Sequence, residues 1–293
     1  MANMMIRKPL VSIVTPAYNA ERYIEDTIKS IMNQTYPYIE HIVIDDGSTD
    51  KTPQILQSYE KLYNLKWFSK KNEGQAITVN KGFDLASGDI VVWLNADDVL
   101  FTKDAIYEVV KAFIRQPRAD VVYGHMAIID EENHLLKIWY APPVLNFKVL
   151  LLGHFAACVF YRRSIVSKYK LNSSLNYAID YDQCLRMARD GVKFHFVNKP
   201  LIGWRRHKAA KSVRQRESLI EETINVRKKY TTNNTNYYNQ YILKIFIYTI
   251  IFVRKLYGIK DIVEFYTAPT KLAFNVKFDL LTKQIFRQII PFS

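Results

Sequence analysis

Residues 89–98 read Asp-Ile-Val-Val-Trp-Leu-Asn-Ala-Asp-Asp, a short apolar run that ends in two adjacent acids. A run of this length, rich in β-branched residues, predicts a strand over 89–95 that is buried on both faces. We expect a helix over 74–86, which Gly88 closes, and another over 105–115. Buried strands that alternate with amphipathic helices indicate a mostly parallel sheet covered on both faces.

The same alternation extends toward both ends of the chain. Toward the N-terminus the pattern predicts the strands 10–15, 41–46 and 65–69 and the helices 19–33 and 52–63. Toward the C-terminus it predicts the strands 120–124, 157–161 and 193–197, the helix 180–189 and a hairpin of 126–129 with 135–139. The sequence therefore predicts an α/β fold with a Rossmann-like, mostly parallel sheet and helices on both faces.

The charge of the chain is concentrated in its last third. The protein has 293 residues and a formal net charge of +13. Residues 1–204 hold 24 Lys and Arg against 22 Asp and Glu, a net +2, whereas residues 205–293 hold 17 against 6, a net +11. We therefore predict a nearly neutral module followed by a basic region that meets an anionic partner.

The composition excludes several classes of protein. A hydrophobic fraction of 49% and a charged fraction of 24% exclude a disordered or low-complexity chain. Two cysteines, Cys158 and Cys184, exclude a disulfide scaffold and favour a reducing compartment. Residues 1–9 hold no apolar stretch before a cleavage site, so a signal peptide is not expected.

The basic region contains an apolar segment over residues 241–257. Its uncharged core, residues 245–253, is too short to span a bilayer, which takes about 20 residues. Lys244, Arg254 and Lys255 flank this core, as in a helix that lies in a membrane interface. A helix packed on the α/β domain with its charges in solvent explains the same pattern, and both alternatives stay open.

Polar residues follow three of the predicted strands: 15–19 after the first, 45–48 after the second and 95–98 after the fourth. Ligands of open α/β sheets bind outside the carboxyl ends of the strands, so these side chains are expected to meet at one rim. Asp and Asn at strand ends also serve as turn formers and helix caps. The carboxylates of 45–48 and 95–98, brought to one rim, would repel one another without a cation, which favours a binding site.

The adjacent acids Asp97 and Asp98 suit a hard divalent cation such as Mg²⁺ or Mn²⁺, with one acid as ligand and the other orienting it. The alternative is that one of the two acids lies at a helix N-terminus, where the helix dipole stabilises its negative charge. Asp180 opens a predicted helix and is either a general base or a dipole-stabilised acid. His207 is either part of a metal or phosphate site or an ordinary surface histidine.

Six motifs in order carry a resemblance to a known family: Val-Ser-Ile-Val-Thr-Pro-Ala-Tyr-Asn (11–19), Ile-Val-Ile-Asp-Asp-Gly-Ser-Thr-Asp (42–50), Asn-Glu-Gly-Gln-Ala-Ile-Thr-Val-Asn-Lys-Gly-Phe (72–83), Trp-Leu-Asn-Ala-Asp-Asp (93–98), Ala-Ile-Asp-Tyr-Asp-Gln-Cys-Leu-Arg (178–186) and Trp-Arg-Arg-His (204–207). Over about residues 9–212 the chain resembles the inverting family 2 glycosyltransferases of the GT-A fold. The resemblance implies that residues 1–212 form a GT-A catalytic domain, which leaves residues 213–293 as the basic and, we expect, mainly helical C-terminal region. Any one motif alone is weak, but their combination is specific.

The resemblance also implies roles for individual residues. The residues expected to bind the donor nucleotide or shape its site are Thr15, Pro16, Ala17, Tyr18, Asp45, Asp46, Gly74, Asn80, Asn95 and Ala96. Asp97, Asp98 and His207 would hold Mn²⁺ or Mg²⁺ on the diphosphate, and Asp180, six residues before Arg186, would be the catalytic base. The chain departs from the family in one place, since Asn95 replaces the first acid of the Asp-x-Asp motif, which puts the strength of metal dependence in question.

By the same resemblance, the substrates are a nucleoside diphosphate sugar, with UDP-sugar favoured, and a glycan or lipid-linked glycan acceptor. The expected process is surface polysaccharide or glycolipid synthesis, in the cytoplasm or at the cytoplasmic face of the membrane, where the basic region would contact anionic lipids. Acceptor specificity is expected between Ile128 and Tyr177, a region that includes His154 and Arg162.

Other functions explain less of the sequence. A nucleic-acid-binding protein would explain the basic region but not the acidic rim, and nucleic acid is not an expected partner. A dinucleotide-dependent dehydrogenase would need Gly-x-Gly-x-x-Gly after its first strand, where this chain has Thr-Pro-Ala-Tyr-Asn. A sugar-phosphate nucleotidyltransferase would begin with a Gly-rich basic loop, which is absent there. A non-catalytic carbohydrate-binding or scaffold protein on a degenerate transferase fold remains the alternative, and Asn95 is its only support.

Overall fold

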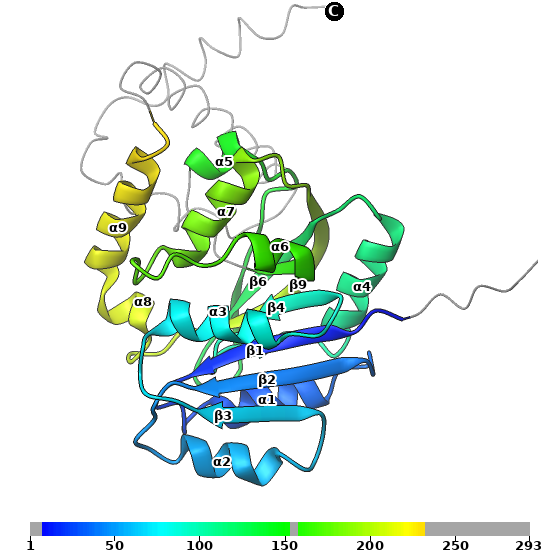
Figure 1. Ribbon diagram of the computed structural model, residues 1–293, viewed down its shortest axis with the longest axis vertical. Coiled ribbons are helices and arrows are strands. Elements are labelled where there is room, and N and C mark those ends of the chain that lie inside the picture. Colours follow the sequence, from blue (N-terminus) through cyan, green and yellow to red (C-terminus); the bar gives the residue numbers. More distant parts are fainter. Residues whose placement is uncertain (1–7, 153–157, 232–293) are drawn as a thin grey trace, which may run out of the picture. The chain divides into compact units, whose positions relative to one another are not determined.

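The computed structural model describes residues 8–152 and 158–231, which form a sheet with helices on both faces (Figure 1). Four parallel strands make the first half of the sheet, in the order β3 (Leu65–Ser69), β2 (Ile39–Asp45), β1 (Val11–Ala17) and β4 (Ile90–Trp93). They are the first four strands that the apolar runs predict. Their carboxyl ends point the same way, as parallel pairing requires.

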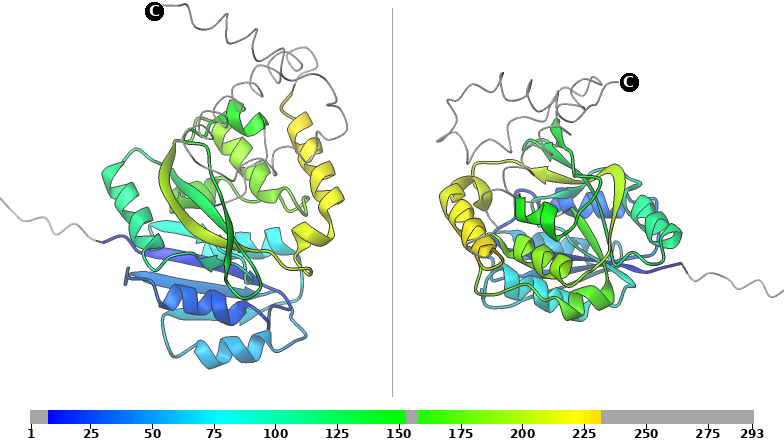
Figure 2. Two further views of the ribbon diagram at one scale, coloured as in Figure 1. Left: turned by 180° about the vertical axis from the view of Figure 1, so that it is seen from behind. Right: turned by 90° about the horizontal axis from the view of Figure 1, so that it is seen from above.

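The second half of the sheet is mixed. It continues from β4 through β8 (Val159–Arg162), β6 (Val121–Ile129), β9 (Phe194–Arg205) and β5 (Val99–Leu100), and β7 (Leu135–Trp139) pairs with β6. Strand β8 runs antiparallel to both of its neighbours, whereas β6 and β9 are parallel to each other. The predicted α/β fold is confirmed, and the predicted parallel order holds in the first half of the sheet, where a helix follows each of the first three strands. Seen from behind, the hairpin of β6 and β7 stands beside β9 (Figure 2).

Helices cover both faces of the sheet because residues alternate in direction along each buried strand. On one face Val11 and Ile13 of β1 pack in clusters with α1 (Ile24–Met32) and α4 (Ala105–Arg115), and α2 (Thr52–Tyr59) packs beside α1. On the other face Val14 packs in the cluster that holds α3 (Gln75–Leu85), α5 (Phe147–Leu152), α6 (Arg163–Lys168) and α7 (Ile179–Arg189). These two clusters form most of the core.

The structure shifts several predicted boundaries. The helix expected over 19–33 begins at Ile24, because Asn19 adopts a left-handed φ of 48° and the next residues form turns. The strands expected over 120–124 and 126–129 are one continuous strand, β6, whose nine residues are all buried. The last predicted strand extends to Arg205, so β9 carries the chain directly to the Trp-Arg-Arg-His motif.

The start of the predicted basic region packs on the α/β domain. Helices α8 (Lys211–Arg214) and α9 (Arg216–Lys228) follow β9, and Val226 of α9 is fully buried in the same cluster as α5 and α7. The boundary at residue 212 stays a prediction. Within residues 8–152 and 158–231, no helix combines the length and apolar character that crossing a membrane requires. The apolar segment 241–257 and His154 lie outside the described residues.

Candidate active site at the carboxyl ends of the strands

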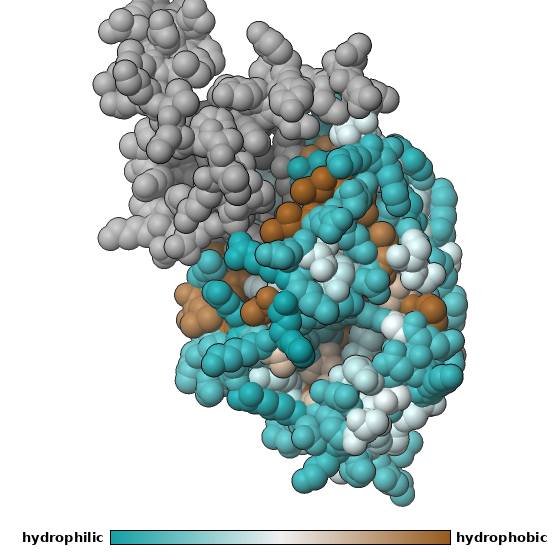
Figure 3. Space-filling model, turned by 90° about the vertical axis from the view of Figure 1, so that its left-hand side faces the viewer, coloured by the Kyte–Doolittle hydropathy of each residue, from teal (hydrophilic) through white to brown (hydrophobic). Residues whose placement is uncertain are grey.

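The polar segments after β1 and β2 meet at the rim. The backbone N–H of Asn19 donates to the Ser48 hydroxyl at 2.9 Å, and the N–H of Thr49 donates to Asn19 Oδ1 at 2.8 Å. The segment after β4 is tied to α1, because the Thr27 hydroxyl donates to the carbonyl oxygens of Ala96 at 3.0 Å and Asp98 at 2.7 Å. Figure 3 shows the face of the molecule toward which these strands point, a mainly hydrophilic surface with separate hydrophobic patches.

Asp45 and Asp46 are both buried and hold neighbouring loops. Asp45 accepts the N–H of Ser48 at 3.1 Å and the hydroxyl of Ser69 at 2.7 Å. Asp46 accepts the N–H groups of Glu73 and Gly74 at 3.0 and 2.9 Å and forms an ion pair with Lys70. Burial opposes ionisation of Asp46, but these donors hold its pKa below the usual value. The pair therefore fixes the loop that leads into α3.

The other residues predicted to line the donor site differ in exposure. Thr15 is buried and its hydroxyl lies 2.9 Å from His41 Nε2, Ala17 is buried, and Pro16 is half-buried. Tyr18 is 55% exposed, so it is the side chain of this group that a ligand can reach. Gly74 has a φ of 91°, a conformation that favours glycine, at the start of α3.

Asn80 has both polar side-chain atoms engaged within the protein. Its Nδ2 donates to the carbonyl of Leu171 at 2.9 Å, and its Oδ1 accepts the N–H of Leu171 at 2.8 Å. This reciprocal pair fixes α3 to the segment that leads toward α7. Contact of Asn80 and the other predicted residues with a donor nucleotide stays a prediction.

Asn95 organises the loop between β4 and β5. Its Oδ1 accepts Trp93 Nε1 at 2.8 Å and Gln75 Nε2 at 2.9 Å, and its Nδ2 donates to Asp98 Oδ2 at 2.9 Å. A neutral amide can accept and donate in this way, whereas an aspartate would place another carboxylate against buried Asp98. The departure from Asp-x-Asp thus has a local structural role.

Asp98 faces inward and Asp97 faces outward. Asp98 is 5% exposed, and its Oδ1 accepts the backbone N–H of Arg205 at 3.0 Å. Burial, together with the neighbouring charge of Asp97, raises the pKa of Asp98 well above its usual range. The Asp97 side chain is 33% exposed, and its Oδ2 lies 3.0 Å from His207 Nε2. Asp97 can therefore bind a ligand from solvent, whereas the carboxylate of Asp98 is engaged within the protein.

Asp97 and His207 fit a divalent cation. A carboxylate oxygen and an imidazole nitrogen both suit Mn²⁺, and the carboxylate suits Mg²⁺. His207 is 8% exposed, and its Nδ1 has no hydrogen-bond partner among the described residues. Tyr23 packs against the ring of His207 at a centroid distance of 4.6 Å. The third predicted ligand, Asp98, is turned away from solvent and already accepts two hydrogen bonds.

A second group of residues of the types that bind cations lies at the turn between β6 and β7, and no sequence motif predicts it. The ligand atoms of Asp130, Glu132 and His134 lie within 4.8 Å of one another, and the group is half-buried to exposed. His134 Nδ1 lies 3.1 Å from Asp130 Oδ2, and Asp130 also accepts two backbone N–H groups of the turn. Because Asp and Asn are common in turns, the sequence pattern predicted only a hairpin.

Asp180 lies in the first turn of α7 and is half-buried. Its Oδ1 accepts the N–H of Tyr181 at 2.7 Å. Asp182, by contrast, is buried and accepts Arg186 Nε at 2.8 Å. Of the two acids in this motif, Asp182 has a structural partner and Asp180 is the one that offers a reachable carboxylate.

The start of α3 and the loop before α7 line a small polar cleft with a lysine of α8. The lining residues are Glu73, Gly74, Gln75, Ala76, Ile77, Ser173, Leu175, Asn176 and Lys211. Lys211 donates to the Asn176 carbonyl at 2.5 Å, and burial lowers its pKa. The cleft thus brings the third motif next to the segments around the fifth and sixth.

Comparison with known proteins identifies the family of the chain. The family model described as glycosyl transferase family 2 matches residues 12–170. The Bacillus subtilis protein named as a teichuronic acid biosynthesis glycosyltransferase, TuaG, is 35% identical over 52% of this chain and 61% of its own length. Chondroitin synthase of Escherichia coli is 33% identical over 66% of this chain, which covers only 28% of that protein.

Solved structures share the fold. The structure of S. aureus TarS 1-349 in complex with UDP-GlcNAc matches with a TM-score of 0.59 and 21% identity, over 69% of this chain and 60% of that one. The mannosyltransferase PcManGT of Pyrobaculum calidifontis, in complex with GDP-Man and Mn²⁺, matches with a TM-score of 0.57 and 16% identity over 76% and 64%. Together with the match over residues 12–170, the GT-A-like fold and the ordered motifs lead to one conclusion: the chain belongs to glycosyl transferase family 2.

Proposed function

We propose that the protein is an inverting, metal-dependent glycosyltransferase that moves a sugar from a UDP-sugar to an acceptor hydroxyl. The observation that carries the proposal is the Asp97–His207 pair, a partly exposed carboxylate and a nearly buried imidazole 3.0 Å apart at the carboxyl ends of the strands. Bound there, Mn²⁺ or Mg²⁺ would offset the charge that develops on a diphosphate leaving group. Asp98 orients the loop from within.

The donor is proposed to lie along the rim formed by the ends of β1, β2 and β4. Tyr18 is exposed there, and Gly74 opens α3 beside the polar cleft. UDP is favoured as the nucleotide because S. aureus TarS has been solved with UDP-GlcNAc and with UDP, although a related mannosyltransferase structure contains GDP-Man. In this proposal Asp45 and Asp46 shape the base and ribose pocket through the loops that they hold.

Asp180 is proposed as the general base. It removes the proton from the acceptor hydroxyl, and that oxygen attacks the anomeric carbon opposite the diphosphate. The new C–O bond forms as the bond to the diphosphate oxygen breaks, so no covalent sugar–enzyme intermediate is needed and the configuration inverts. A positioned base of this kind contributes about 10²–10⁴-fold in rate. Its place in the first turn of α7 leaves the carboxylate half-buried and reachable.

The acceptor is proposed to be a glycan or lipid-linked glycan of a surface polysaccharide or glycolipid. Relatives are named for teichuronic acid biosynthesis, chondroitin synthesis and hyaluronan synthesis, which supports a polysaccharide product. Residues 128–177 are proposed to select the acceptor. We also propose that residues 1–212 form the catalytic domain and that the basic region 213–293 associates peripherally with anionic lipid at the cytoplasmic face of the membrane.

A panel of nucleotide sugars tests the proposal. UDP-, GDP- and dTDP-sugars are incubated with the protein and candidate acceptors, with Mn²⁺ or with chelator, and the released nucleoside diphosphate is measured. We expect Mn²⁺-dependent release from one nucleotide class and, by NMR, inverted configuration in the product. Binding of a UDP-sugar without release under any condition would instead favour a non-catalytic carbohydrate-binding or scaffold protein.

A further inference from the structure

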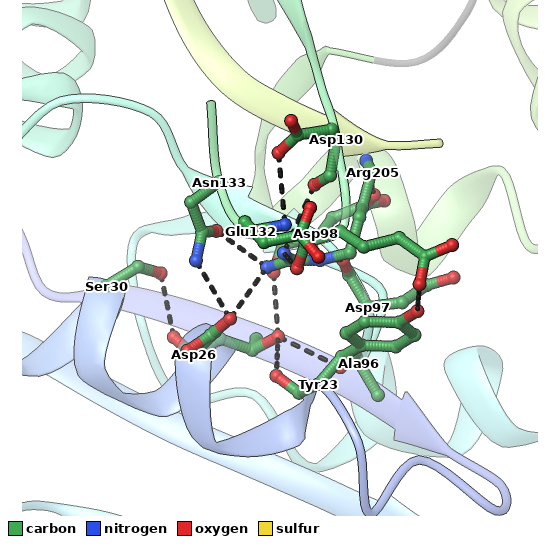
Figure 4. Close-up of polar contacts among 12 residues, drawn as sticks. Tyr23, Asp26, Ser30, Ala96, Asp97, Asp98, Asp130, Glu132, Asn133 and Arg205 are labelled. Atoms are coloured by element: carbon green, nitrogen blue, oxygen red, sulfur yellow. Dashed lines mark hydrogen bonds and ion pairs between the residues drawn. The ribbon is translucent and has the colours of Figure 1, made fainter. Parts of the chain in front are cut away.

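Arg205, the last residue of β9, is buried with none of its side chain exposed. Its guanidinium nevertheless joins three segments of the chain (Figure 4). Nε donates to the Asp97 carbonyl at 2.9 Å, and Nη1 donates to the Glu131 carbonyl at 2.9 Å and more weakly to the Asp130 carbonyl at 3.4 Å. Nη2 donates to Asn133 Oδ1 at 2.7 Å and to Asp26 Oδ2 at 3.1 Å.

These contacts connect the loop that carries Asp97 with the turn between β6 and β7 and with α1. The planar guanidinium offers five N–H donors in a fixed geometry, so its partners are held in fixed directions relative to one another. Burial of a charged group is unfavourable unless it is paired and hydrogen-bonded, and each of the three guanidinium nitrogens has a partner here. Loss of one partner therefore disturbs the others.

Tyr23 extends the same arrangement to His207. The ring of Tyr23 lies 4.9 Å from Arg205 Cζ and 4.6 Å from the ring of His207, so it contacts both. Its hydroxyl donates to Glu131 Oε2 at 3.3 Å, on the same turn that Arg205 contacts. The orientation of Asp97 thus depends on Arg205 through a carbonyl, and that of His207 depends on it through Tyr23.

We propose that Arg205 is a positioning residue that sets the Asp97–His207 pair for cation binding and ties it to the β6–β7 turn. The inference rests on the proposed function, since it assumes that this pair holds the cation. Arg205 does not touch the cation or the donor in this account. Because the β6–β7 turn lies in the region proposed to select the acceptor, Arg205 makes the cation site sensitive to the position of that turn.

Arg205→Lys provides the first test, because it keeps the charge but replaces the planar fork with a single ammonium. The binding of MnCl₂ in the presence of UDP is measured by calorimetry and by the EPR signal of free Mn²⁺, and UDP binding is measured in chelator. We expect Mn²⁺ affinity to fall about 10–100-fold, as for other changes beside metal ligands. UDP affinity in chelator should change less than about 2-fold. Arg118→Lys, at an exposed site in the loop before β6, should leave both unchanged.

Asn133→Gly provides a second test that spares the buried charge. Asn133 has a φ of 72°, which glycine adopts without strain, so the change removes only the amide that contacts Arg205 and Asp26. We expect a fold close to wild type by circular dichroism and a smaller loss of Mn²⁺ affinity, about 3–10-fold. This variant decides the question if Arg205→Lys does not fold.

The outcomes separate the two proposals. Wild-type Mn²⁺ affinity in folded Asn133→Gly, or in both variants, would overturn the positioning role of Arg205 while leaving the proposed function intact. An equal loss of UDP affinity with and without Mn²⁺ would also overturn it, because that loss would reflect general disruption of the site. Absence of Mn²⁺ binding in the wild-type protein with UDP would overturn the proposed function itself.

Discussion

His207 Nε2 lies 3.0 Å from Asp97 Oδ2, although the two residues are 110 positions apart in the sequence. The contact joins the loop after β4 to the residues that follow β9. The pairing of β9 with β6 ends just before them, at the hydrogen bond from the Arg206 N–H to the Ile129 carbonyl. Because Asp97 is a third exposed and His207 is nearly buried, the pair presents one open side to solvent. Because the two expected cation ligands lie on segments that are distant in the sequence, cation binding depends on how these two segments are aligned.

Asp97 and Asp98 are predicted to respond differently to substitution. Asp97→Ala should abolish Mn²⁺-dependent UDP binding and change the free energy of unfolding by less than about 1 kcal/mol, because its carboxylate is partly exposed. Asp98→Ala should lower that free energy by about 1–3 kcal/mol, because the Arg205 N–H and Asn95 Nδ2 lose their acceptor. Urea unfolding and calorimetry measure the two effects. Equal loss of stability in both variants would contradict the inward and outward roles.

Asp180→Asn is predicted to reduce glycosyl transfer by about 10²–10⁴-fold, since an amide cannot remove the acceptor proton. UDP affinity should stay within about 3-fold of wild type, because the residue is assigned no contact with the nucleotide. Asp190→Asn, at the exposed end of the same helix, is the matched control and should retain activity. Unchanged turnover in Asp180→Asn would assign the base to another residue.

Stability is predicted to fall as the pH falls below about 6.5, in part through His41. This residue is fully buried between the Tyr63 hydroxyl at 2.6 Å and the Thr15 hydroxyl at 2.9 Å, and burial lowers its pKa to about 3. The unfolded chain takes up a proton near pH 6.5 that the folded chain takes up only near pH 3, so protonation favours unfolding between these values. At pH 5 the loss is about 2 kcal/mol.

His41→Gln isolates this contribution, because glutamine keeps a donor and an acceptor but does not titrate. Urea unfolding of both proteins at pH 7 and pH 5 gives the difference. The wild type should lose about 2 kcal/mol more than the variant over this interval. The same loss in both proteins would show that His41 does not titrate as its burial implies.

Helix α9 is predicted to stabilise the segment that precedes α7. Glu222 accepts the N–H groups of Asn176, Tyr177 and Ala178 at 2.9, 2.5 and 2.6 Å. Glu222→Ala should therefore lower the free energy of unfolding by about 1–3 kcal/mol. Glu221→Ala, one exposed residue earlier, should change it by less than about 0.5 kcal/mol. Equal stabilities of the Glu222→Ala and wild-type proteins would contradict this role of α9.

The sequence predicted the first half of the fold well because its signals are local. Apolar runs identified β1 to β4, and helical spacing identified α3 and α4 to within a residue or two. The order of the second half depends on pairing between distant segments. Strand β8 pairs with β4 and with β6, a neighbour relation that its four residues do not encode. Short helices such as α5 and α6 also lack enough turns for a periodic signal.

The candidate site was predictable as a set of positions but not as a set of contacts. The motifs predicted Asp97, Asp98 and His207 as cation ligands. Only the structure shows that Asp98 is buried and therefore differs from Asp97. Asn80 was singled out within a motif, but its pairing with Leu171 depends on a segment 91 residues away. Arg205 lies within the Trp-Arg-Arg-His motif, and nothing local in the sequence indicates that its charge is buried.

Calorimetry on the full wild-type protein measures whether the site binds a nucleoside diphosphate in a cation-dependent way. UDP is titrated into the protein once in the presence of Mn²⁺ and once in the presence of chelator. GDP, dTDP and CMP are titrated in the same two conditions. We predict that UDP binds in Mn²⁺ and binds at least about 10-fold more weakly in chelator, in keeping with removal of a ligand-bridging cation. Absence of binding by any of these nucleotides to folded protein, or binding that chelator does not weaken, would contradict a cation-dependent nucleotide site.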